Sequence, residues 1–252
     1  MIIQKFITII LLSFLFFPSY NAQSFDQKAG PNAQQPGSGP NTAHNKGTNG
    51  TRSCSVSAEQ IRLCTDNDLI SQLDALPIEE LTETEEADLL FMREEEKLAR
   101  DAYTLFNTLW GSVIFDRISM AEQKHMDALL LLIDRYNLVD PIVDDVPGIF
   151  INPDLQALYD LLAASGSNSL VDALMAGAEI EEVDIADLQG SELATDNLDI
   201  QLIYDNLMKG SRNHLRSFVS NLELLGIVYE PRHLTVEEFE LIINPPMERG
   251  QK

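Results

Sequence analysis

Two successive predicted helices carry ligand-type side chains on the apolar stripes that a helix normally buries. Glu96 lies on the first stripe, which steps by three and four residues through Leu89, Met92, Ala99, Tyr103 and Phe106. Glu122 and His125 are three residues apart on the second helix and therefore project from one face. A buried charge needs a partner, and carboxylates and imidazoles that converge between helices are the groups with which a bundle holds metal.

The same arrangement recurs in the second half of the chain. A Glu pair followed by an Asp five residues on occurs at 95–101 and again at 181–187. Each block precedes an apolar helix with one His, which is His125 in the first half and His214 in the second. Recurrence of this kind predicts two helical hairpins related by pseudo-symmetry, each contributing half of one site.

Capping signals and helix breakers divide the apolar part of the chain. Thr82 with Glu85 predicts a capping box, and Asn152-Pro153 predicts the start of a shorter crossover helix. Gly210 predicts close packing or a bulge inside the last long helix. The expected helices cover residues 83–109, 113–136, 153–164, 170–188, 199–225 and 235–243.

The fold class predicted from these helices is all-α. No segment alternates in the manner of a strand, and 44% of the residues are apolar, which suits one helical domain with tails. We expect a four-helix bundle at 81–228, made of two pseudo-symmetric hairpins with a long crossover containing a short helix. A lead-in segment at 53–80 precedes this domain, and a tail with a short helix at 229–252 follows it.

Two stretches, EKLARDAY at 96–103 and EQKH at 122–125, resemble the first two helices of rubrerythrins and their relatives in the ferritin-like superfamily. Residues 81–225 also resemble a bacterial ferritin-like family catalogued as a domain of unknown function, through IEEVDIADL at 180–188 and GSRNHL at 210–215. The superfamily implies a di-iron or di-manganese site with one Glu on each of two helices and Glu-x-x-His on each of the other two.

The sequence leaves open which member of each Glu pair is the ligand, because Glu95 and Glu181 also border apolar stripes. Glu96 is preferred because it matches the rubrerythrin-like spacing to Tyr103, and Glu182 is preferred as its partner in the repeat. The alternative interpretation is that the acids are solvated and that the histidines are hydrogen-bonded core residues without a metal. The predicted metal ligands are Glu96, Glu122, His125, Glu182 and His214.

The last long helix departs from the superfamily pattern. It carries Ser211 three residues before His214, where the pattern requires Glu, so one bridging carboxylate is missing. Either Asp184, one turn from Glu181, substitutes for it, or the site holds one metal.

Hard carboxylates with imidazole suit iron or manganese, so we expect one or two such ions. The expected activity is that of a di-iron oxidoreductase, which oxidises iron or reduces peroxide. The rival hypothesis is a metal-free binding or interaction module that keeps the bundle and uses the polar cluster as a buried hydrogen-bond network.

The N-terminal residues predict export to the periplasm or the extracellular space. Residues 1–22 have the short apolar run and polar end of a signal peptide, with an uncleaved anchor as the alternative. Residues 23–52 are rich in Gly, Pro, Asn and Gln and predict a disordered leader. Cys54 and Cys64 then form a local disulfide in that compartment or remain two free thiols.

The formal net charge of −23 limits the partners. Nucleic acid is excluded, because binding it depends on neutralising phosphates with Lys and Arg. The charge attracts cations or simply maintains solubility. We expect metal ions as partners, no stable membrane span after signal cleavage, and a homodimer as a compatible assembly.

Overall fold

The computed structural model describes residues 67–249. The expected signal peptide, the leader, Cys54, Cys64 and the first part of the lead-in segment, 53–66, lie outside the described residues. The described helices are α3 (Asn67–Asp74), α4 (Glu83–Trp110), α5 (Val113–Arg135), α6 (Pro153–Gly166), α7 (Leu170–Ala194), α8 (Leu198–Leu224) and α9 (Val236–Ile243). No strand occurs within 67–249, so the all-α prediction is confirmed for this part of the chain.

The helix ends follow from local chemistry. The backbone N–H of Glu85 donates to the Thr82 hydroxyl at 3.2 Å, and the Thr82 N–H donates to the Glu85 carboxylate at 2.8 Å. This is the predicted capping box, and it satisfies donors that the first turn of α4 would otherwise leave free. Gly111 ends α4 in the left-handed conformation with φ 61°. The Asn152 side chain caps α6, which has Pro153 in its first turn as predicted.

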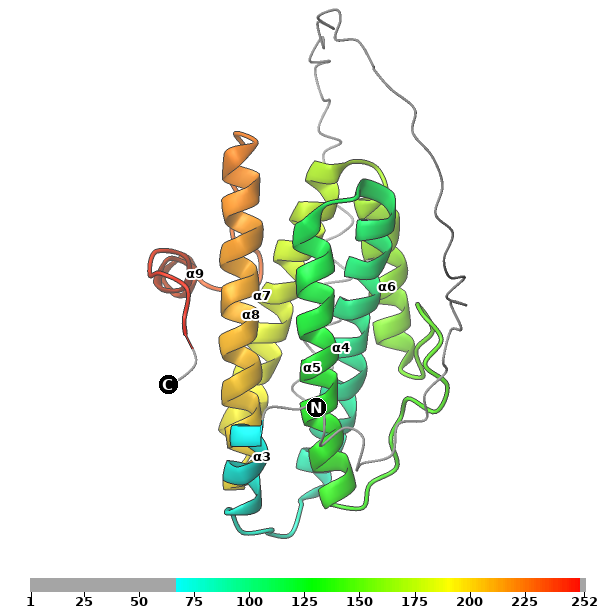
Figure 1. Cartoon of the computed structure of the whole chain (residues 1–252), viewed down its shortest axis with the longest axis vertical. Helices are drawn as coiled ribbons and strands as arrows, with labels where there is room; N and C mark the ends of the chain where they lie inside the picture. Colours follow the sequence, from blue (N-terminus) through cyan, green and yellow to red (C-terminus); the bar gives the residue numbers. More distant parts are fainter. Residues whose placement is uncertain (1–66, 250–252) are drawn as a thin grey trace, which may run out of the picture.

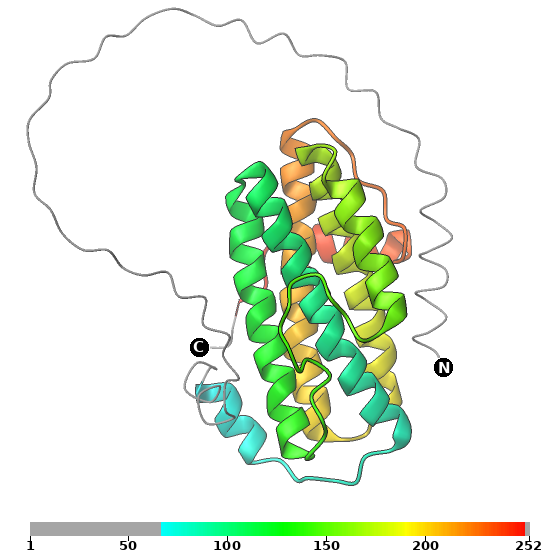
Figure 2. The same cartoon turned by 90° about the vertical axis from the view of Figure 1, so that its right-hand side faces the viewer.

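The four long helices form two hairpins packed against each other (Figures 1 and 2). Helix α4 packs on α5, and α7 packs on α8; across the interface between the hairpins, α4 contacts α7 and α5 contacts α8. Helix α6 of the crossover lies against α4 and α7, while α9 contacts α8. The short α3 was not predicted, and it packs through the buried Leu73. None of the helices within 67–249 has the length and hydropathy to cross a bilayer.

The crossover is held on α4 by charged residues of the EKLARDAY stretch. Lys97 is fully buried, and its ammonium donates to the Asp101 carboxylate at 2.6 Å and to the carbonyl of Val146 at 2.8 Å. The ammonium also lies 4.5 Å from the centre of the Phe150 ring. These residues of the stretch therefore fix the chain that leads to α6.

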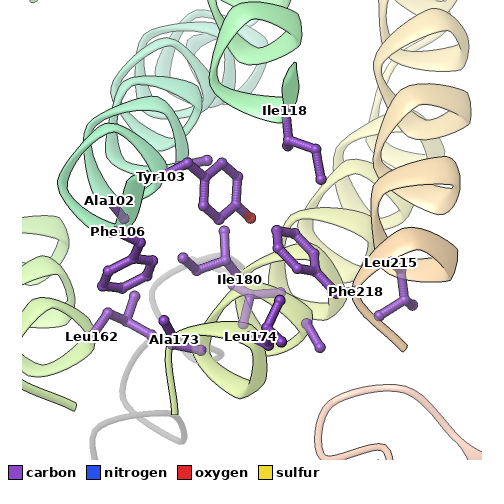
Figure 3. Close-up of a cluster of buried hydrophobic side chains, with 14 of the residues drawn as sticks. Ala102, Tyr103, Phe106, Ile118, Leu162, Ala173, Leu174, Ile180, Leu215 and Phe218 are labelled. Atoms are coloured by element: carbon purple, nitrogen blue, oxygen red, sulfur yellow. The ribbon is translucent and has the colours of Figure 1, made fainter. Parts of the chain in front are cut away.

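The apolar core consists of two clusters. One contains Tyr103, Phe106, Phe115 and Phe218, with the Tyr103 and Phe218 rings 5.2 Å apart between centres (Figure 3). The other contains residues from the N-terminal part of α4, the C-terminal part of α5 and the N-terminal part of α8. A layer of polar residues separates the two clusters at the level of Glu96.

Candidate metal centre

The first half of the polar layer comes from α4 and α5. Nδ1 of His125 lies 2.8 Å from a Glu122 oxygen and 3.2 Å from a Glu96 oxygen. Glu96 and Glu122 are almost completely buried, and the second oxygen of Glu96 has no hydrogen-bond partner. The ligand atoms of the three side chains lie within 4.8 Å of one another, which is close enough for one ion.

The second half uses the other oxygen of Glu122 with residues from α7 and α8. Nδ1 of His214 lies 2.8 Å from Glu122 Oε1 and 3.4 Å from a Glu181 oxygen. Neither His214 Nδ1 nor Glu122 Oε1 is engaged in a hydrogen bond, despite their short separation. The ligand atoms of Glu122, Glu181 and His214 also lie within 4.8 Å of one another. Glu122 is therefore shared by two adjacent groups.

The surroundings orient this cluster. A β-carbon at Gly210 would lie 2.4 Å from Nε2 of His125, so only glycine leaves room for that imidazole. The predicted close packing at this position is confirmed, and α8 continues as an α-helix without a bulge. On the opposite side, the Tyr103 hydroxyl donates to Glu181 at 2.5 Å and so connects the cluster with the aromatic core.

The structure brings together four of the five predicted residues, and Glu182 is the exception. The Glu182 carboxylate faces away from the cluster and accepts hydrogen bonds from the Tyr229 hydroxyl at 2.5 Å and from the N–H groups of His233 and Leu234, each at 2.9 Å. Its place is taken by Glu181. Neighbouring helix positions differ by about 100° in direction, so the two members of the pair cannot face the same side.

The correction had a signal in the sequence. Glu181 lies midway between Leu174 and Leu188 in seven-residue steps, and both leucines are buried. The internal repeat favoured Glu182 because it aligned the two Glu pairs without an offset. Glu94, which precedes the Glu pair on α4, also lies outside the cluster; its carboxylate accepts from the Ile151 N–H at 2.6 Å and anchors the crossover.

Ser211 and Asp184 meet at the edge of the cluster. Ser211 is fully buried, and its hydroxyl donates to the Leu207 carbonyl at 3.0 Å. Asp184 lies against Ser211 and interacts with Glu96 and Glu181. One of its oxygens is buried without a hydrogen-bond partner. An α7 carboxylate thus occupies the neighbourhood from which the missing α8 carboxylate would have projected.

Burial and mutual proximity shift the proton affinities of these groups. Burial raises the pKa of Glu96 to about 7. Burial alone would also raise the pKa of Glu122, but the charges of His214 and His125 hold it far below its usual value. In turn, the carboxylates of Glu122 and Glu181 outweigh burial and raise the pKa of His214 to about 10. Without metal, protonated imidazoles therefore balance the shared carboxylate.

The comparisons with known proteins agree on one group of relatives. A family described as "Uncharacterized protein domain (DUF2202)" matches residues 85–246. The uncharacterized protein MJ0754 of Methanocaldococcus jannaschii is 46% identical over 182 residues, covering 72% of this chain and 98% of that protein. The crystal structure of hypothetical protein MJ0754 from Methanococcus jannaschii superimposes with a TM-score of 0.68 at 47% identity, covering 69% of this chain and 99% of that chain.

Proposed function

The chain belongs to the DUF2202 family, and we propose that it is a ferritin-like protein whose bundle holds two iron or manganese ions. The observation that carries the proposal is the position of Glu122, whose two oxygens each lie 2.8 Å from Nδ1 of a different His. A carboxylate placed in this way can bridge two ions. The proposed ligands are Glu96 and His125 for one ion, Glu181 and His214 for the other, and Glu122 between them.

The donor set fits this metal pair. Glu96, Glu122, Glu181 and Asp184 are buried carboxylates, and their combined charge offsets that of two divalent ions once the imidazoles are neutral. Oxygen donors with imidazole suit iron and manganese, and no thiolate takes part in either group of candidate ligands within the described residues. We propose Asp184 as the replacement for the carboxylate that Ser211 lacks.

When bound, a pair of such ions supplies electron transfer to or from oxygen or peroxide. The surrounding residues keep the ligands in place and restrict water. Tyr103 holds Glu181, and burial together with the charge of Glu181 keeps the pKa of Tyr103 well above its usual value, so the phenol stays a hydrogen-bond donor. The two apolar clusters enclose the polar layer on both sides.

Metal analysis tests the proposal. Protein purified without a histidine tag is loaded anaerobically with Fe(II) or Mn(II), desalted, and analysed for metal and protein content. We expect two equivalents in the wild-type protein and fewer than one in Glu122→Gln. Glu192→Gln, at a partly exposed position of α7, serves as the control and keeps two. Absence of bound metal in the wild-type protein, also after aerobic iron loading, would instead support the metal-free interaction module.

A further inference from the structure

A row of acidic side chains continues from the candidate metal centre toward one end of the bundle. On α7, Asp184 and Asp187 follow Glu181 in steps of three residues. On α4, Glu95 precedes Glu96, and Asp88 lies two turns nearer the start of the helix. Steps of three, four and seven residues place side chains on neighbouring parts of one helix face, so the row follows the α4–α7 interface.

The inner members of the row lack partners although they are buried. Glu95 is 4% exposed and Asp187 is 1% exposed, and all four of their carboxylate oxygens have no hydrogen-bond donor. Asp184, at 5%, leaves one oxygen without a donor. By contrast, Glu94 and Glu182 are equally buried but accept several backbone N–H bonds. Burying a carboxylate without a partner is costly, so the row has the character of a site for a cation.

The members of the row are neighbours in space. Glu95 interacts with Asp187 and Asp184, and Asp184 interacts with Glu96 at the centre. Asp187 also interacts with Asp88 on the outer side and with His233. Asp88 is half-buried and lies beside Ser191, so it is the point where the row meets solvent.

The outer end of the row is left open by the crossover. Helix α6 covers α4 and α7 near Leu98 and Val183, where Leu158 and Leu162 line a small cavity with Glu95. The N-terminal part of α4, which carries Asp88, extends beyond α6 at the lower end of the molecule (Figure 2). An ion that reached Asp88 would therefore meet carboxylates and not the apolar α6 interface.

We propose that Asp88, Asp187, Glu95 and Asp184 form a transit path along which divalent cations enter the bundle between α4 and α7, with Glu95 and Asp187 as an intermediate holding site. This inference rests on the proposed metal centre and adds the route by which that centre is filled. Closely spaced carboxylates raise the local concentration of cations. A cation can move from one carboxylate to the next, because each step exchanges one set of oxygen ligands for another.

Anaerobic loading with Co(II) tests the path, because the visible bands of Co(II) report its ligands without any turnover. Stopped-flow absorbance gives the rate of entry, and equilibrium titration gives the number of sites. The test variants are Asp187→Asn and Glu95→Gln in the full chain. Glu86→Gln is the matched control, since Glu86 is exposed on the first turns of α4 and its substitution also removes one negative charge.

We expect both test variants to bind Co(II) at the centre with unchanged stoichiometry and an unchanged final spectrum. Each should load Co(II) at least about tenfold more slowly, because a row of negative charges raises the rate at which cations enter. Glu86→Gln should load at the wild-type rate. The metal-free variants should melt no lower than the wild-type protein, because each substitution removes one of two buried acidic groups whose charges repel each other. Slow loading would then not reflect misfolding.

The possible failures are distinguishable. Equal loading rates in all four proteins, with Co(II) still bound at the centre, would overturn the path and leave the proposed function standing. A Co(II) spectrum that is the same in His125→Ala as in the wild-type protein would overturn the proposed centre, and the path with it. Equal slowing in the Glu86 control would show that overall charge, and not the row, governs entry.

Discussion

Glu122 Oε1, on the first hairpin, lies 2.8 Å from His214 Nδ1, on the second. Glu122 also contacts His125 on its own helix through its other oxygen. Both halves of the candidate centre thus depend on one side chain, whereas Glu96 belongs to one half and Glu181 to the other. This asymmetry of roles leads to different expectations for each substitution.

Glu122→Gln should abolish binding of both ions, whereas Glu96→Gln should mainly weaken one. Loss of a ligand should cost at least the roughly tenfold in affinity that even changes around the ligands cause. Metal titration followed by calorimetry separates the two binding steps. Equal losses in the two variants would contradict a bridging role for Glu122.

Gly210→Ala should weaken metal binding while leaving the fold intact. The added methyl would lie 2.4 Å from His125 Nε2, and the imidazole can only respond by turning away from the carboxylates. Gly190→Ala is the control, because nothing lies within 4 Å of its β-carbon position within α7. That variant should keep its metal and gain about 0.5–1 kcal/mol of helix stability. Melting curves and metal titration of both variants provide the measurements.

Substitutions of the neighbouring residues Glu181 and Glu182 should have opposite effects on metal content and on stability. Glu182→Ala removes the acceptor of the N–H groups of the 232–234 segment, of which that of Leu234 is buried, and should lower the free energy of unfolding by about 1–3 kcal/mol, with metal content retained. Glu181→Gln should lower metal content with little loss of stability. Denaturant unfolding and metal analysis on the same samples would expose the opposite pattern if the assignment were reversed.

Asp184→Asn should weaken the second ion in particular, because we propose Asp184 as the carboxylate that replaces Glu at position 211. Ser211→Glu alone should crowd Asp184, since Ser211 is fully buried against it. The double variant Asp184→Ala, Ser211→Glu moves the carboxylate from α7 to α8 and should restore two equivalents. Metal stoichiometry that is unaffected by Asp184→Asn would show that another group completes the centre.

The metal-free protein should lose stability as the pH rises from about 5 toward 10. His214, with a pKa raised to about 10, and Glu96, with a pKa raised to about 7, bind more protons folded than unfolded over this range. Their contribution to stability is therefore complete when the pH lies below the pKa values of the unfolded state. It is lost as the pH rises through the pKa values of the folded state. The lowered pKa of Glu122 affects the stability of the protein only at acidic pH. Melting temperatures across this range provide the check.

Metal binding should show the reverse dependence on pH. The ligands must lose their protons before they can coordinate an ion, so binding should release protons and grow tighter as the pH rises. Calorimetric titrations in buffers of different ionisation enthalpy count the protons released. Proton release that is unchanged in His214→Ala would contradict the assignment of this imidazole as a ligand.

The sequence by itself determined the four long helices, α6, α9 and most of the polar layer, but not the short α3. Capping at Thr82 and Asn152 depends on neighbours within three residues, so the starts of α4 and α6 could be predicted from local chemistry. The placement of Glu96 and Glu122 followed from helical periodicity, because each lies well inside an apolar stripe. Helix α7 extends six residues beyond its predicted end at Leu188, since a helix tolerates Gly190 when later residues such as Ser191 are buried.

The tertiary structure decided what depends on the rotation of one helix against another. The spacing of Glu181 to Leu174 and Leu188 favours it over Glu182, but the packing of α7 against α4 and α8 is what brings its carboxylate to Glu122 and His214. The contact of Asp184 with Ser211 joins residues on different helices, and no periodicity within one helix encodes it. The row of acids reaching Asp88 has the same origin, because its members become neighbours only when the two hairpins pack together.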